Sequence, residues 1–126
     1  MSKHPMTFDE ISDIIRAYLV ERDWHTQSPR SLAISIVLEA GELLEHFQWN
    51  EQPVGGASAI GEELADIFIY AFNVAQTYDI DLPQEIIKKL DKAKAKYPAK
   101  NFKGKAGTKR DEVWLKAKLN HKKEGL

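Results

Sequence analysis

Two apolar segments, each carrying a pair of carboxylates one helical turn apart, are the feature that most constrains this chain. Glu39 and Glu42 lie in the first segment, and Glu63 and Asp66 repeat the spacing in the second. Residues three positions apart lie on the same side of an α-helix, so each helix presents its two carboxylates as neighbours. Two such helices packed together could direct four carboxylates at one point.

The residues beside these acids are apolar, which separates the two pairs from an ordinary charged surface. At about 100° per residue, the first pair shares a narrow helical sector with Ser35 and His46, and leucines border that sector. In the second segment the acids begin a polar stripe that continues through Tyr70 and Asn73, between isoleucine and valine positions. We therefore expect the four acids to face the interior of the fold.

Clustered carboxylates within apolar surroundings need a cation, because like charges and burial both disfavour ionisation. The candidates are basic side chains, such as Arg30 and the later lysines, or a divalent metal. An all-oxygen ligand set suits Mg²⁺ or Mn²⁺, whereas zinc favours Cys or several His. We therefore predict a metal site made by Glu39, Glu42, Glu63 and Asp66, with Mg²⁺ as the ion and Mn²⁺ as a substitute.

Helical signals cover most of the chain, and none of its segments alternates like a strand. Thr7 and Glu10 have the spacing of a capping box, and Ser28 followed by Pro29 is a strong helix start. We predict helices over residues 7–22, 28–49, 58–78 and 82–96, with Ser58 capping the third. After these we expect a mobile basic loop at 99–109, an amphipathic segment from 108 and a disordered tail at 121–126.

The whole chain is expected to form a single domain over residues 1–126, with a core at about 7–98 and a C-terminal extension. A length of 126 residues suits one domain, and the net charge of −1 gives no general attraction to nucleic acid. The absence of cysteine fits a reducing compartment. No apolar run reaches the roughly 20 residues of a membrane span, and the N-terminus lacks a secretory apolar region. We expect a cytoplasmic location, with no membrane association.

Aromatic and basic residues near the acid segments are candidate ligand contacts. Trp24 and His25 precede the first acid helix and Trp49 ends it, so one of these side chains could stack on a base. The lysine run at 88–96, which includes Lys92 and Lys96, could hold phosphate oxygens. The alternative is that the aromatic residues are packing anchors and the lysines form a solvated helix face.

The ordered motifs resemble those of the all-α nucleoside triphosphate pyrophosphohydrolases, the MazG-like superfamily. Glu39-Ala40-Gly41-Glu42 and Glu63-Leu64-Ala65-Asp66 look like its E-x-x-E and E-x-x-D motifs, and the likeness continues through Ser28-Pro29-Arg30, Phe47-Gln48-Trp49, Asp81-Leu82-Pro83 and Lys96-Tyr97-Pro98. It covers about residues 24–104 and is greatest to the dCTP pyrophosphatase-like branch.

The resemblance implies an antiparallel four-helix bundle with an additional C-terminal helical segment, assembled as a homodimer or homotetramer. It also implies Mg²⁺-dependent hydrolysis of nucleoside triphosphates to the monophosphate and pyrophosphate, with dCTP or modified pyrimidine nucleotides as candidate substrates. The expected substrate contacts are Trp24, His25, Arg30, Trp49, Tyr70, Asn73, Lys92 and Lys96.

One residue departs from the family pattern, and two other functions fit the same motifs. Many relatives have Asn where this chain has Ala93, so that contact is missing or comes from Asn73 or a lysine. The alternatives are a phosphoribosyl-ATP pyrophosphohydrolase-like enzyme and a non-catalytic helical oligomer that binds nucleic acid. Any of the four acids, most plausibly a glutamate, could also act as general base.

Overall fold

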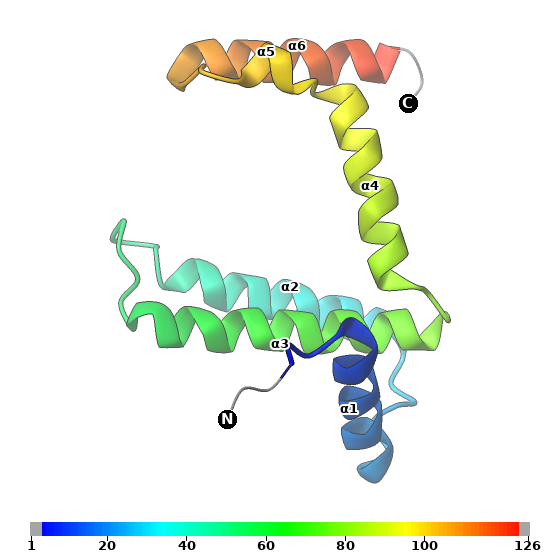
Figure 1. Ribbon diagram of the computed structural model, residues 1–126. Helices are drawn as coiled ribbons and strands as arrows, with labels where there is room; N and C mark the ends of the chain where they lie inside the picture. Colours follow the sequence, from blue (N-terminus) through cyan, green and yellow to red (C-terminus); the bar gives the residue numbers. More distant parts are fainter. Residues whose placement is uncertain (1–3, 124–126) are drawn as a thin grey trace. The chain divides into compact units, whose positions relative to one another are not determined.

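The computed structural model describes residues 4–123, and all regular secondary structure in that range is helical (Figure 1). Its helices are α1 (Phe8–Glu21), α2 (Pro29–Glu45), α3 (Gly56–Thr77), α4 (Leu82–Lys96), α5 (Ala99–Phe102) and α6 (Gly107–Lys123). The prediction of an all-α chain is confirmed for this range. Within it, no helix is both long and apolar enough to cross a membrane.

The first two helices begin where the capping signals predict. The Thr7 hydroxyl accepts a hydrogen bond of 3.1 Å from the Glu10 N–H, and the Ser28 hydroxyl accepts one of 3.1 Å from the Ser31 N–H. Each bond satisfies a backbone donor that has no partner within the first turn of its helix. These short-range bonds fix the starts of α1 and α2 without help from the rest of the fold.

The connection between α2 and α3 begins four residues earlier than predicted and also ends two residues earlier. Helix α2 ends at Glu45, and not at Trp49, because the next turn tightens through a 2.9 Å bond from the Phe47 N–H to the Leu44 carbonyl. The Val54 N–H then donates to the His46 carbonyl at 3.3 Å and closes the loop on itself. The prediction that Ser58 caps α3 is wrong, since the helix starts at Gly56 after a glycine N-cap that makes no side-chain bond.

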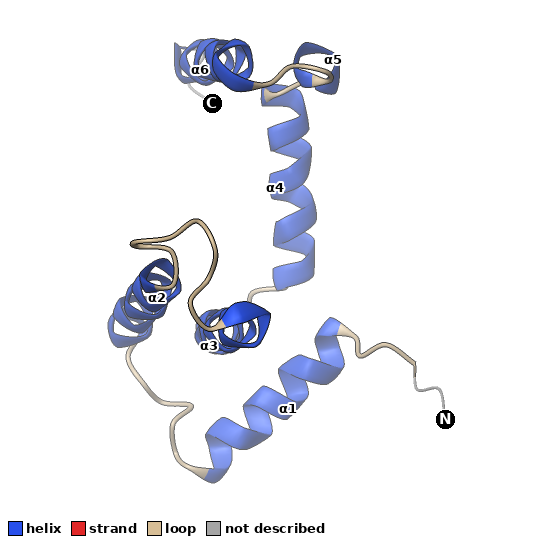
Figure 2. Cartoon of the chain, turned by 90° about the vertical axis from the view of Figure 1, so that its left-hand side faces the viewer, coloured by secondary structure: helices blue, strands red, loops and turns tan. Residues whose placement is uncertain are grey.

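The first compact unit contains α1, α2 and α3 and extends to residue 82. Helices α2 and α3 lie antiparallel along their length, and α1 runs across α3 (Figures 1 and 2). Ile15 and Leu19 of α1 pack with Phe72 of α3 to form the core, and Leu32 of α2 is fully buried. The Gln76 amide also donates to the Ser12 carbonyl at 2.8 Å, which ties α3 to α1.

The second compact unit begins at residue 83 and holds α4, α5 and α6. Helix α4 has the predicted bounds, but the stretch predicted as a mobile loop contains α5 and the start of α6. The Tyr97 ring lies 5.8 Å from that of Phe102 and 6.4 Å from that of Trp114, centroid to centroid, so a small aromatic cluster orders this stretch. The tail predicted to be disordered is helical through Lys123, and its last three residues lie outside the described range.

Three broader expectations stay predictions at this point. Clustering of contacts divides the chain into two units, which does not test whether residues 1–126 act as a single domain. The first unit supplies an antiparallel helix pair crossed by a third helix, so the four-helix bundle also stays a prediction. The same holds for assembly into oligomers.

Candidate functional site

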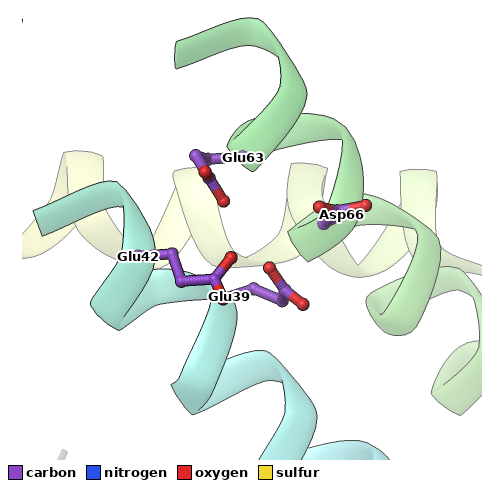
Figure 3. Close-up of side chains that lie close together, drawn as sticks. All are labelled: Glu39, Glu42, Glu63 and Asp66. Atoms are coloured by element: carbon purple, nitrogen blue, oxygen red, sulfur yellow. The ribbon is translucent and has the colours of Figure 1, made fainter. Parts of the chain in front are cut away.

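The α2–α3 pair brings the four acids of the sequence motifs together. Glu39 and Glu42 extend from α2, Glu63 and Asp66 extend from α3, and the four carboxylates are directed toward one another (Figure 3). One carboxylate oxygen from each residue can be chosen so that all four atoms lie within 4.8 Å of one another. Because α2 and α3 are antiparallel neighbours, their i, i+3 pairs meet across the helix interface.

The cluster has an inner and an outer pair of acids. Glu39 and Glu63 are half-buried, whereas Glu42 and Asp66 are exposed. The Oε2 atoms of Glu39 and Glu63 are buried and have no hydrogen-bond partner within the described chain. A buried carboxylate oxygen without a partner is costly, so these two atoms identify a place where a cation would be stabilising.

Crowding of the carboxylates changes the acidity of Glu39. A hydrogen bond with Glu42 raises the pKa of Glu39 from 4.5 to about 7, and partial burial and the charges of Glu42, Asp66 and Glu63 act in the same direction. Glu39 therefore holds a proton over part of the physiological pH range in the absence of a cation. A metal ion that binds there must displace this proton.

A histidine completes the inner side of the cluster. His46 Nε2 lies 3.4 Å from Glu63 Oε1, and the two side chains are only 19% and 17% exposed. No lysine or arginine among residues 4–123 forms an ion pair with any of the four acids. The basic side chains that could have neutralised the cluster, Arg30 among them, do not do so here.

The donor set fits a hard divalent cation. All four groups are carboxylates, and Mg²⁺ prefers oxygen ligands at about 2.0–2.1 Å. Oxygens on opposite sides of one such ion are about 4.2 Å apart, which is close to the 4.8 Å spread of the candidate ligand atoms.

A cavity of about 640 Å³ adjoins the acid cluster between α1 and α3. Asp66 belongs both to the cluster and to the cavity wall, where Tyr70, Asn73 and Trp24 also lie. The remaining wall is mostly apolar and comprises Ile11, Ile14, Ile15, Tyr18, Leu19, Gln27, Ala65, Phe68, Ile69 and Phe72. Its size and its apolar lining with few polar groups are typical of sites for small organic ligands.

The other residues predicted to contact substrate are more scattered. His25 is half-buried next to Trp24, and its Nδ1 is buried without a hydrogen-bond partner in the described chain. Arg30 is exposed in the first turn of α2, and Trp49 is 84% exposed in the α2–α3 loop, outside the cavity lining. Lys92 and Lys96 belong to α4 in the second unit, so their contribution to the site stays a prediction.

Two residues of this site, Tyr18 and His46, were not among the contacts predicted from the sequence. Tyr18 of α1 lies edge-on to Trp24, with ring centroids 5.9 Å apart, and both line the cavity. The helical spacing of Tyr18 with Ile11, Ile15 and Leu19 indicates an apolar stripe, but this spacing does not indicate which residue Tyr18 contacts. His46 did share the helical sector of Glu39 and Glu42, and that position was the available signal for its contact with the cluster.

Comparison with known proteins identifies relatives over most of the chain. The MazG-like family matches residues 34–111, a stretch that includes all four clustered acids. The chain is 35% identical to dCTP pyrophosphatase 1 of Mus musculus and 37% identical to that of Bos taurus, each over 109 residues. These alignments cover 79% of this chain and 64% of the relative, so the chain spans less than two thirds of the relatives' length.

A solved structure has a similar helical fold over most of this chain. A pyrophosphatase from Archaeoglobus fulgidus DSM 4304 matches with a TM-score of 0.65 and 30% sequence identity. The match covers 78% of this chain and 98% of that structure. The similarity therefore extends well beyond the paired acid motifs.

Proposed function

The chain belongs to the MazG-like family, and on that premise we propose that it hydrolyses nucleoside triphosphates to the monophosphate and pyrophosphate. The observation that carries the proposal is the convergence of Glu39, Glu42, Glu63 and Asp66, with candidate ligand atoms within 4.8 Å. Relatives named dCTP pyrophosphatase 1, at 35–37% identity, support the same class of reaction.

Divalent metal, with Mg²⁺ as the proposed ion, reconciles this site with a triphosphate substrate. A triphosphate carries several negative charges and would be repelled by four carboxylates alone. When bound, Mg²⁺ neutralises phosphate charge and lowers the pKa of a coordinated water. Glu39 and Glu63, whose Oε2 atoms are buried without partners, would form the inner part of the ligand set. Glu42 and Asp66 would complete it from the exposed side.

The nucleoside would occupy the cavity between α1 and α3. Asp66 lies on the cavity wall and in the acid cluster, so a ligand that fills the cavity can extend its phosphates toward the metal ligands. Trp24 and Tyr70 offer aromatic surface to a base. The side-chain amide of buried Asn73 can distinguish hydrogen-bond donors from acceptors on the edge of that base. We propose a pyrimidine deoxynucleoside triphosphate such as dCTP, or a modified pyrimidine nucleotide, as the substrate.

From the sequence we also propose that lysines hold the outer phosphates. Fourteen of the eighteen Lys and Arg residues follow Leu82, Lys92 and Lys96 among them. Lysine ammonium groups bind phosphate as mobile point charges and need no fixed geometry to do so. Arg30 is a further candidate, because it is exposed at the start of the acid-bearing helix α2.

Self-association as a homodimer or homotetramer is part of the proposal. Helix α2 carries four apolar residues, Ile34, Val37, Leu38 and Leu44, that are 51–70% exposed. At 100° per residue they fall within one stripe on the side of α2 opposite Leu32, and Leu38 at the edge of the stripe lies beside Glu42. Two copies that pair these stripes would bury them and build a four-helix arrangement.

Light scattering should give a mass above that of the monomer for the wild type and a lower mass for Val37→Asp. A monomeric wild type at micromolar concentration would contradict this part.

The test of the activity is a Mg²⁺-dependent pyrophosphate-release screen over canonical and modified nucleotides, with phosphoribosyl-ATP included. Each acid is also changed singly to its amide, and every variant is melted in EDTA. We expect Mg²⁺ affinity and turnover to fall together, while stability in EDTA holds or rises because repulsion is relieved. Variants that keep their activity but lose stability in EDTA would instead indicate a structural charge network, and release from no nucleotide would refute the proposal.

A further inference from the structure

His46 stands apart from the proposed ligands because it contacts only one of them. Its Nε2 atom lies 3.4 Å from Glu63 Oε1, across a sequence separation of 17 residues. Both side chains are more than four-fifths buried, so water has little access to the contact. The other oxygen of the same carboxylate, Oε2, is buried and has no partner within residues 4–123.

We propose that His46 is a positioning residue that holds the Glu63 carboxylate by Oε1, so that Oε2 stays directed at the metal site. This inference rests on the proposed function, since it assigns Glu63 a ligand role. The Nε2–H tautomer and the doubly protonated ring both donate from Nε2, so the role does not depend on the charge of the histidine. A free glutamate side chain rotates about three torsions, and one fixed oxygen removes much of that freedom.

The α2–α3 loop in turn fixes His46. The His46 carbonyl accepts the 3.3 Å hydrogen bond from the Val54 N–H that closes the loop. Gly55 follows directly, and a Cβ atom at that position would lie 3.7 Å from Cε1 of the His46 ring and 2.5 Å from the Cβ of Ala59. Residue 55 must be glycine because of its close approach to Ala59 in the first turn of α3, and this places the loop in ordinary van der Waals contact with the His46 ring. The positions of the loop and of Glu63 are linked through the histidine.

The first test compares two substitutions of His46 in the full chain. Leucine keeps much of the bulk and removes the donor, whereas the amide of glutamine can place an N–H near the position of Nε2. We expect His46→Leu to lower Mg²⁺ affinity, measured by calorimetry, by about 10-fold or more, as is typical when a ligand loses its supporting hydrogen bond. His46→Gln should restore most of that affinity. Mn²⁺ affinities measured by electron paramagnetic resonance should rank the three proteins in the same order.

The second test perturbs the loop and leaves the histidine in place. Gly55→Ala should lower Mg²⁺ affinity, since the added Cβ clashes with Ala59 and so displaces the loop that contacts the His46 ring. Gly61→Ala is the matched control, because a Cβ at Gly61 meets nothing within 4 Å. In a His46→Leu background, Gly55→Ala should have no additional effect, because the link to Glu63 is already broken.

The outcomes separate this inference from the proposed function. Suppose that the wild type binds Mg²⁺, that Glu63→Gln does not, and that His46→Leu binds as tightly as the wild type. The positioning role would then be refuted, while the proposed metal site would stand. A His46→Gln variant as weak as His46→Leu would also refute it, because the donor would then not matter. If the wild type binds no Mg²⁺ at all, the proposed function fails, and this inference fails with it. Melting in EDTA verifies that each variant is folded.

Discussion

Replacing Trp24 with alanine tests whether the cavity beside the acid cluster holds the base. Trp24 lines this cavity and is 46% exposed, so part of its indole is available to a ligand. Stacking of one base on an aromatic side chain is worth about 1–3 kcal/mol. Losing that interaction equally from the bound substrate and the transition state should raise KM about 5- to 150-fold and leave kcat nearly unchanged.

The same substitution has a cost in stability that can be estimated separately. About half of a tryptophan's ~250 Å² is withdrawn from water here, which corresponds to about 3 kcal/mol at ~25 cal/mol per Å², as an upper value. The edge-on contact with Tyr18, at 5.9 Å between ring centroids, is lost as well. Urea unfolding therefore accompanies the kinetics, because partial unfolding lowers the active fraction and kcat without changing KM.

Two variants serve as controls for this experiment. Trp24→Phe keeps an aromatic face, so its KM should lie between those of the wild type and Trp24→Ala. Trp49 is 84% exposed and does not line the cavity, so Trp49→Ala should cost little stability. A folded Trp24→Ala enzyme with the KM and base preference of the wild type would refute the cavity as the base site. If Trp49→Ala alone raised KM, the base would have to bind at the α2–α3 loop instead.

Three further results follow from the site and the core. The pKa of Glu39 is raised from 4.5 to about 7, so its contribution to stability is fully present below pH 4.5 and is lost as the pH rises through 7. In thermal melts in EDTA, the wild type should become less stable across that pH window. The Glu39→Gln variant should lack this part of the loss. Saturating Mg²⁺ should stabilise the wild type by about 2.7 kcal/mol at 100 times the Kd, and Glu63→Gln should show no such shift in thermal unfolding. Leu32→Ala should destabilise the chain by about 2–5 kcal/mol in urea, since Leu32 is fully buried between helices, whereas Val54→Ala, at a loop site 75% exposed, should cost far less.

Features that depend on neighbours within one helical turn could be predicted from the sequence. The Thr7 and Ser28 caps are bonds to residues three positions ahead, and both form where the motifs indicate. The spacing of each acid pair fixes its shared helix face in the same way. These interactions require no knowledge of which helices meet, and so the all-α class and the paired carboxylates could be inferred from residue order alone.

Features that depend on contacts between distant segments were decided by the tertiary structure. The end of α2 at Glu45 is linked to a loop closed by Val54, and the contact between His46 and Glu63 joins residues 17 positions apart. The cavity exists because α1 crosses α3, a packing choice that the periodicity of either helix leaves open. The raised pKa of Glu39 likewise requires carboxylates from two helices at one point. Periodicity determines which face of a helix is apolar, but only packing determines which partner covers that face and which polar atoms lose their water.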